Sequence, residues 1–187
     1  MSQSLGAIID ALTIAARTQH PVRVERDLDW WADDVLGFVV SVGEQWVVLL
    51  RLMDSVYVDG IEVVRIEDVT SVEEDCEGGF VERAVASLGR PKVDFNLPED
   101  ADTRDVLRAA ADHSSLICVY LEAEDDYPLL IGHLEGLGER KFDIQLINPR
   151  GVWDVETSRW AYKDVTRVTF GGRYEDALER FGEGRPV

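Results

Sequence analysis

Apolar residues along this chain recur at two spacings, one typical of helices and one typical of strands. In residues 4–17 an apolar residue returns every three or four positions, which predicts an amphipathic helix with Ser4 as its N-cap. In residues 21–26 apolar and polar positions alternate, which predicts a strand. The chain therefore begins with a helix followed by a strand.

The next stretch is the most apolar part of the chain. Gly43 interrupts its first two apolar runs, and Asp59-Gly60 is a sequence typical of hairpin turns. A short helix is expected after Gly78-Gly79, at residues 80–88. The strands predicted here are 35–41, 46–52, 61–66 and 69–74.

The second half of the chain follows the same order of elements. Thr103 is the predicted N-cap of a helix over 103–113, and Gly171-Gly172 precedes a terminal helix over 173–181. Between these helices, the strands predicted are 116–123, 129–137, 140–148, 152–157 and 164–170.

Corresponding positions in the two halves lie at a nearly constant distance along the sequence. The pairs Gly37 and Gly132, Gly43 and Gly138, and Asp59 and Asp154 are each separated by about 95 positions. This match predicts an internal duplication. The expected units are residues 1–89 and 103–187, joined by a linker at 90–102 that contains Pro91 and Pro98.

A helix and about five short strands are too few for a β-sandwich, and they suit a small bent barrel. The predicted fold is α+β but mainly β: two tandem small antiparallel β-barrels, each with a leading and a trailing short helix. This order resembles the Sm-like fold, a helix followed by an SH3-like barrel. It is also similar to bacterial proteins that end in R-x-x-D-V-x-x-V, here Arg65, Asp68, Val69 and Val72.

The Sm-like resemblance implies RNA binding in rings, through basic and polar loop residues. The sequence departs from that pattern, because the loop at 54–60 is acidic. No Arg-Gly or Lys-Gly pair stands where Asp59-Gly60 and Trp153-Asp154 are found. The resemblance therefore supports the barrel prediction more than it supports RNA binding.

Charge is the strongest feature of the composition. The formal net charge is −18, from 37 acidic and 19 basic residues. Residues 1–96 hold 18 acidic and 8 basic residues, hence −10, and the remainder holds 19 and 11, hence −8. Proteins that bind nucleic acid usually carry a basic patch, so we expect no nucleic-acid partner. A basic protein is the expected partner, although the charge also serves solubility.

The sequence shows no pattern typical of an enzyme. Nucleotide-binding glycine motifs and the G-x-S-x-G nucleophile motif are missing. His20 and His113 are expected at helix ends, where a cation favours the helix dipole, and the counterpart of His133 in the first half is Phe38. Cys76 and Cys118 lie far apart, without zinc-ligand spacing. We expect a non-catalytic protein without a cofactor or a bound metal. The acidic clusters at 27–34, 73–77 and 122–126 are expected to form a solvated rim.

Two adjacent tryptophans, Trp30 and Trp31, stand in an otherwise acidic loop. One interpretation has them cap the end of a barrel; the other has one of them anchor a partner, with carboxylates around it to pair with Lys or Arg. The second half has a lesser loop of the same kind, with one aromatic residue. The predicted partner-binding residues are Asp27, Asp29, Trp30, Trp31, Asp33, Asp34, Asp125, Asp126 and Tyr127.

These features lead to a hypothesis of function: an acidic interaction module, such as an immunity protein that sequesters a basic toxin domain. An Sm-like nucleic-acid-associated or regulatory module is the alternative, and an enzyme with an unrecognised carboxylate site is a third. No apolar run reaches the roughly 20 residues of a membrane-spanning helix, and the N-terminus lacks a basic region typical of a signal peptide. We therefore expect a cytoplasmic protein without membrane contact. The sequence leaves the oligomeric state open.

Overall fold

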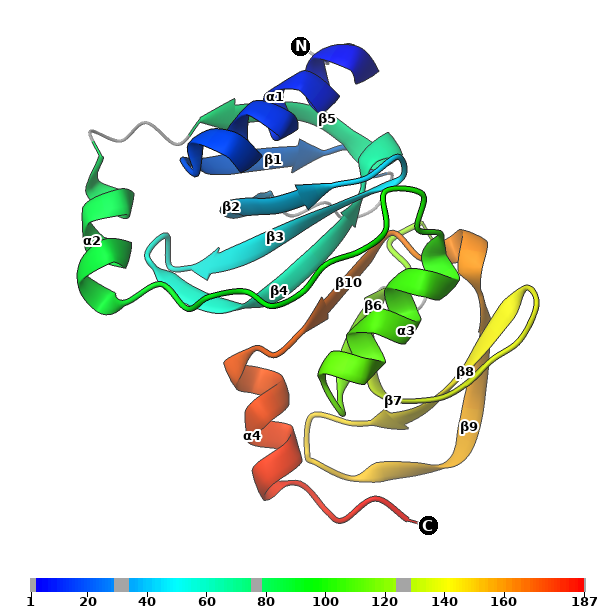
Figure 1. The fold of residues 1–187 in the computed structure, drawn as a ribbon. Coiled ribbons are helices and arrows are strands. Elements are labelled where there is room, and N and C mark those ends of the chain that lie inside the picture. Colours follow the sequence, from blue (N-terminus) through cyan, green and yellow to red (C-terminus); the bar gives the residue numbers. More distant parts are fainter. Residues whose placement is uncertain (1–2, 29–33, 75–78, 124–128, 187) are drawn as a thin grey trace.

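In the computed structural model, residues 3–28, 34–74, 79–123 and 129–186 are described. They form one antiparallel sheet of ten strands with four α-helices around it (Figure 1). The elements of the first half are α1 (Leu5–Thr18), β1 (Pro21–Arg26), β2 (Val35–Val42), β3 (Trp46–Met53), β4 (Tyr57–Arg65), β5 (Val69–Glu74) and α2 (Phe80–Leu88).

The second half repeats this order of elements. It contains α3 (Thr103–His113), β6 (Ile117–Tyr120), β7 (Leu129–Leu137), β8 (Lys141–Ile147), β9 (Trp153–Ala161), β10 (Arg167–Phe170) and α4 (Arg173–Phe181). Two single-turn 3₁₀ helices, η1 (Ile66–Asp68) and η2 (Tyr162–Asp164), lead into β5 and β10. All four predicted helices and all ten predicted strands are present, with shifted ends in several cases.

Two local predictions are wrong. Asp59 and Gly60 lie inside β4 and form no hairpin turn. Gly60 has φ +82°, and a Cβ atom there would lie 2.6 Å from the carbonyl oxygen of Phe170, so only glycine fits this close approach of β4 to the end of β10. At α3 the N-cap is Asp102 instead of Thr103, because Asp102 accepts a hydrogen bond from the Asp105 amide in a capping box.

The strand order is β5-β1-β2-β3-β4-β10-β6-β7-β8-β9, and every neighbouring pair is antiparallel. The prediction of two tandem closed barrels is therefore wrong. In a separate barrel, β4 would pair only with strands of the first half. Instead its outer edge pairs with β10, from Val64↔Arg167 to Ile61↔Phe170. The two halves share a single open sheet, and mainly-β content is the part of the fold prediction that holds.

Each half nevertheless has the same internal strand order. β5-β1-β2-β3-β4 in the first half corresponds, element by element, to β10-β6-β7-β8-β9 in the second. The order of strands is thus compatible with the sequence match at about 95 positions. The duplication itself, like the boundaries of the two units, stays a prediction.

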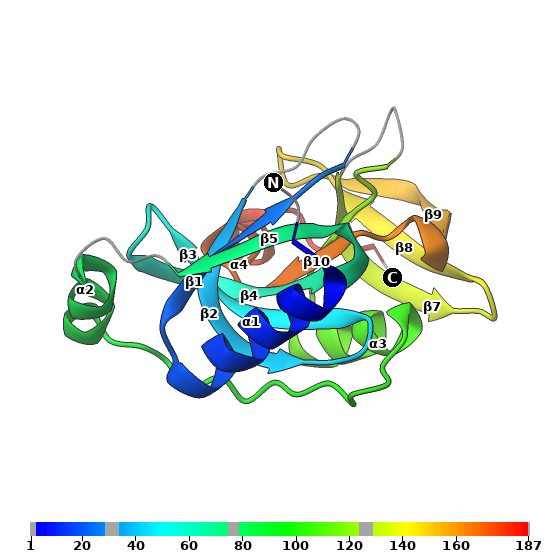
Figure 2. The same ribbon diagram turned by 90° about the horizontal axis from the view of Figure 1, so that it is seen from above.

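The main core belongs to both halves. α3 packs Val106 and Leu107 against strands of the second half, and the same cluster includes Ile61 and Val63 of β4. Phe95, from the segment predicted as a linker, is buried in it as well. A second core lies under α1, and smaller clusters lie under α2 and α4. The turned view in Figure 2 shows α1 and α3 beside the sheet, against which they pack.

Candidate functional site

The strands at the centre of the sheet have one apolar and one polar face. Val63 of β4, Val119 of β6 and Val168 of β10 point into the main core. Their neighbours Glu62 and Arg167 point to the opposite face, because successive side chains of a strand alternate. Both are nonetheless buried, with 1% and 6% of their surfaces exposed. A charged pair thus lies buried in the middle of the sheet.

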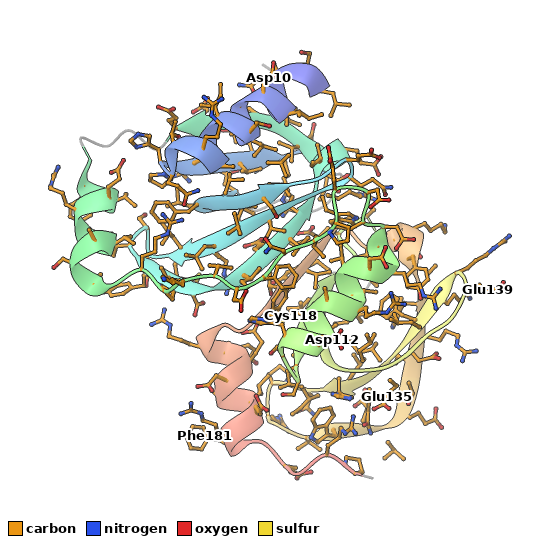
Figure 3. The ribbon with its side chains drawn as sticks, viewed as in Figure 1. Asp10, Asp112, Cys118, Glu135, Glu139 and Phe181 are labelled. Carbon is orange, nitrogen blue, oxygen red and sulfur yellow. The ribbon has the colours of Figure 1, made fainter. Side chains whose placement is uncertain are left out.

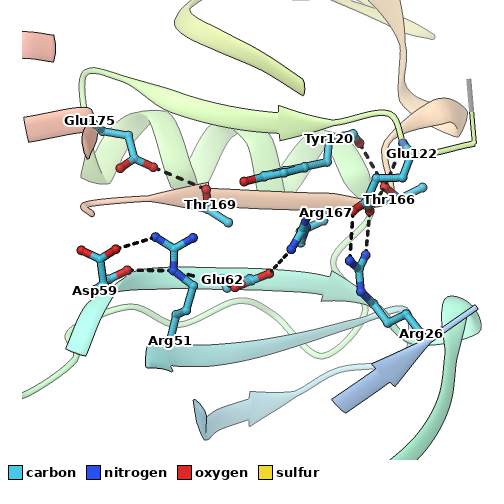
Figure 4. Close-up of polar contacts among 10 residues, drawn as sticks. All are labelled: Arg26, Arg51, Asp59, Glu62, Tyr120, Glu122, Thr166, Arg167, Thr169 and Glu175. Carbon is cyan, nitrogen blue, oxygen red and sulfur yellow. Dashed lines mark hydrogen bonds and ion pairs between the residues drawn. The ribbon is translucent and has the colours of Figure 1, made fainter. Parts of the chain in front are cut away.

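Arg167 connects two carboxylates from different elements (Figure 4). Its Nη1 atom lies 2.9 Å from Oε1 of Glu62, and its Nη2 atom lies 2.8 Å from Oε1 of Glu122, just after β6. Arg26, at the end of β1, donates two further hydrogen bonds to Glu122, at 2.6 Å and 2.9 Å. The guanidinium carbon of Arg167 also lies 3.8 Å from the centre of the Tyr120 ring.

The pairing of charges continues along β4 toward its first residues. Arg51 of β3 approaches Glu62 at 4.0 Å and donates to Oδ2 of Asp59 at 2.9 Å. The second carboxylate oxygen of Asp59 accepts the backbone N–H of Arg173, the first residue of α4, also at 2.9 Å. Charges of alternating sign therefore run from the start of α4 across β4 and β10 to the end of β1. We call the set Arg26, Arg51, Asp59, Glu62, Glu122 and Arg167 the ionic row.

The surroundings hold these groups in their charged forms. Burial alone would raise the pKa of Glu122, but hydrogen bonds from Arg26 and the positive charge of Arg167 outweigh burial and leave the pKa lowered. The pKa of Asp59 is likewise lowered, because the Arg173 amide and Arg51 outweigh its desolvation. A general base or acid needs a proton to exchange near neutral pH. These paired carboxylates are better suited to joining the sheet than to catalysis.

A second buried polar group lies where α4 meets the sheet. Cys118 of β6 donates to Oε1 of Glu175 at 3.2 Å, and Thr169 of β10 donates to the same oxygen at 3.4 Å. Burial and the neighbouring carboxylate raise the pKa of the Cys118 thiol well above its ordinary value. Nucleophilic cysteines need the opposite shift, so this thiol is a packing group and a hydrogen-bond donor.

The histidines lie apart from the ionic row. Nδ1 of His20 is 3.4 Å from Glu82, and Nδ1 of His133 is 2.9 Å from the carbonyl oxygen of Ser115. His113, at the end of α3, packs edge-on against Phe95 and Phe170. In the described part of the chain, these contacts give no imidazole a serine or cysteine nucleophile as partner.

Only two of the predicted partner-binding residues are among the described residues. Asp27 is exposed, and its amide donates to the carbonyl oxygen of Asp68 at 3.2 Å. Asp34 is exposed too, with a carboxylate oxygen 3.8 Å from Arg23. Seven further predicted residues lie outside the described residues: Asp29, Trp30, Trp31, Asp33, Asp125, Asp126 and Tyr127. Whether the two loops bind a partner stays a prediction.

Four arginines of the first half could have formed a basic patch for nucleic acid, and each has an acidic neighbour instead. Arg26 is buried against Glu122 and Arg51 pairs with Asp59, as described above. Arg65 donates twice to Asp68, both times at 2.8 Å, and Arg23 lies beside Asp34. Pairing neutralises these arginines locally, so the four do not present a basic surface to a phosphate backbone.

The acidic residues that the structure describes do not gather into a metal-binding cluster. Within residues 3–28, 34–74, 79–123 and 129–186, no three acidic, histidine or cysteine side chains come together as metal ligands. None of the helices described is both long and apolar enough to cross a membrane. Comparison of the chain with protein-family models, curated proteins and solved structures gives no match.

The ionic row was not predicted from the sequence. The available signal was a charged residue inside an apolar strand, as with Glu62 in β4 and Arg167 in β10. Such a residue requires a buried partner. The partners, however, lie far away in sequence, 96 positions apart for Arg26 and Glu122 and 105 for Glu62 and Arg167. Only the strand order brings them together.

Proposed function

We propose that this protein is a non-catalytic interaction module that binds and sequesters a basic protein. An immunity protein against a basic toxin domain, such as a nuclease, is the most concrete form. The observation that carries the proposal is the net charge of −18, combined with arginines that are paired with the chain's own carboxylates.

The pairing of the arginines leaves a surplus of acidic side chains toward solvent. Exposed carboxylates occur on α1 (Asp10), α3 (Asp112) and the β7–β8 turn (Glu139), as Figure 3 shows. They therefore come from both halves of the sheet. A strongly negative net charge attracts a positively charged protein and raises its association rate. It repels phosphate, so it supports a protein partner over a nucleic acid.

Acidic residues that follow β1, lie in η1 and precede β2 come close together at one end of the first half. The hydrogen bond from the Asp27 amide to Asp68 brings the chain after β1 beside η1, where the side chain of Glu67 is 72% exposed. Asp34, at the start of β2, is exposed at the same end of that hairpin. Because these residues flank the predicted loop, we place the partner contact at this end of the first half.

The test is to isolate a partner with the full chain as bait, identify it, and titrate the purified partner calorimetrically. We expect a basic protein that binds with a sub-micromolar dissociation constant. The double variant Asp27→Lys/Asp34→Lys should weaken binding roughly tenfold or more, as expected for charges at a contact. The control Asp10→Lys/Glu139→Lys changes the net charge equally but elsewhere, and should weaken binding much less.

Two results would contradict the proposal. One is a partner without a basic surface. The other is sub-micromolar, salt-sensitive binding of single-stranded RNA, which would favour the nucleic-acid alternative. Equal loss of affinity in both double variants would leave net charge alone as the cause, and would contradict the location of the contact beside Asp27 and Asp34.

A further inference from the structure

A pocket of about 280 Å³ lies where α4 and the chain after it meet β7 and the start of β9. Its lining shares no residue with the ionic row, and residues 182–185 form one of its walls. We call it the tail pocket. Pockets for drug-sized ligands begin at roughly 300 Å³, so an occupant of the tail pocket would be small.

The chain after α4 is tied to the elements that it faces (Figure 1). The backbone N–H of Glu183 donates to the carbonyl oxygen of Gly151 at 2.7 Å. The carbonyl oxygen of Glu183 in turn accepts the indole N–H of Trp153 at 2.9 Å. Nη1 of Arg185 lies 3.0 Å from Oε1 of Glu135 on β7. The tail pocket is therefore formed before any ligand enters it, which lowers the entropic cost of binding.

The inner surface of the tail pocket is apolar. Leu116, just before β6, and Leu178 of α4 are buried, and with Ile147 they form the small core cluster under α4. Trp153 packs against this cluster and is only partly buried. Leu116, Leu178 and Trp153 all line the pocket, so a hydrocarbon chain would find apolar contacts there.

The polar groups of the tail pocket are mainly acceptors. Nδ1 of His133 lies 2.9 Å from the carbonyl oxygen of Ser115, which can only accept, so Nδ1 carries the hydrogen and Nε2 of the neutral ring is an acceptor. Glu179 accepts the Ser115 hydroxyl at 2.6 Å, and its carboxylate has room for further donors. The hydroxyl of Ser115 and the indole of Trp153 are thus already used as donors.

The charge of the tail pocket is negative. Among the described residues that line it, Arg185 alone is a permanent cation, and its ion pair with Glu135 balances that charge. The carboxylates of Glu179 and Glu183 remain. A matching occupant would therefore supply hydrogen-bond donors and a positive charge on a short apolar body.

We infer that the tail pocket binds an alkylammonium group. The hydrocarbon chain would lie against Leu178 and the Trp153 ring, whose face also attracts a cation. The ammonium N–H groups would donate to Glu179 and to Nε2 of His133. A free aliphatic amine and the side chain of a lysine both carry this group. The inference does not rest on the proposed basic partner, because it concerns a different part of the molecule.

Titration of the full chain with butylamine at pH 7, followed by proton–nitrogen NMR, tests this inference. The Trp153 indole and His133 imidazole signals should shift and saturate with a dissociation constant on the order of 1 mM, the scale of ligands with about five non-hydrogen atoms. Butanol has the same chain length without the charge, and it should bind roughly tenfold more weakly or not at all.

Glu179→Gln removes the negative charge but keeps an acceptor for the Ser115 hydroxyl. It should weaken butylamine binding roughly tenfold, because a charge-assisted hydrogen bond is lost. Glu183→Gln is a second variant with an effect in the same direction. The control Glu139→Gln, in the β7–β8 turn, changes the net charge by the same single unit outside the pocket and should leave binding unchanged.

A lysine with both backbone ends blocked separates the two sources of the ligand. If it binds as butylamine does, the pocket accepts a lysine side chain, and if butylamine alone binds, the pocket is for free amines. Either result supports an alkylammonium site. Butanol that binds as tightly as butylamine, equal weakening in Glu139→Gln and Glu179→Gln, or signals that do not shift with butylamine would overturn the inference.

Discussion

Arg167 is the residue at which the two halves of the molecule meet. It stands on β10, bonds Glu62 on β4 and Glu122 after β6, and packs against the Tyr120 ring. Removing these charges from water costs several kcal/mol for each ion, and only close pairing offsets that cost. The ionic row is therefore better understood as a device that fixes which strands pair than as a source of net stability.

Loss of one charge from this row should be costly. We predict that Glu122→Gln lowers the free energy of unfolding at pH 7 by about 3 kcal/mol, because two buried arginines would lose a shared counter-charge. Chemical denaturation would measure the loss. The exposed Glu139→Gln should change stability by less than about 0.5 kcal/mol. If Glu122→Gln also changed the free energy of unfolding by less than about 0.5 kcal/mol, the ionic row would have no role in the fold.

The pH dependence of the same variant follows from the lowered pKa of Glu122. A carboxylate with a lowered native pKa stabilises the fold above its unfolded pKa, ordinarily 4.5, and this contribution disappears as the pH falls through the native value. The stability difference between the natural chain and Glu122→Gln should therefore be constant near neutral pH and shrink in acid. Denaturation curves at several pH values would show it, and a difference that grew in acid would contradict the assignment.

At the scale of helices and strands, the sequence predicted the elements whose conformation is set by neighbouring residues. It did not predict those that depend on residues distant in sequence. α1, α3 and α4 follow from apolar spacing, and α1 and α3 also have local caps, such as the side chain of Ser4 accepting from the Ala7 amide. Asp59-Gly60 misled because the sequence suits a hairpin turn, whereas Asp59 is held by Arg51 and Arg173 from other elements. The prediction of two closed barrels was wrong for a similar reason, because no local sequence pattern indicates that β4 pairs with β10.

The junction of β4 and β10 gives a prediction at this scale. Gly60→Ala should lower the free energy of unfolding by roughly 2 kcal/mol or more, because φ +82° is unfavourable for alanine and the new Cβ would meet the Phe170 carbonyl. Gly6→Ala in α1 is the matched control: its Cβ would meet nothing within 4 Å, and we expect it to be neutral or stabilising by about 0.5 kcal/mol. Thermal melts of both variants would measure the difference. Equal stability of Gly60→Ala and Gly6→Ala would contradict the close approach of Gly60 to Phe170.

At the scale of the whole molecule, the amino-acid composition was a better guide to the surface than the spacing of apolar residues was to the arrangement of the strands. The charge of −18 predicted an acidic surface, and the structure adds that several arginines are occupied internally. Within the predicted loop at residues 27–34, the described Asp27 and Asp34 are both exposed. One sheet through both halves makes the molecule a single scaffold on which the acidic surface is displayed.

We propose that this acidic surface captures a basic protein. The most direct measurement is the association rate with the isolated partner, followed by stopped-flow fluorescence across a range of ionic strength. Steering by opposite charges predicts that the rate falls steeply as salt rises, while the dissociation rate changes little. An association rate independent of salt, or one that increases with salt, would contradict the proposed function.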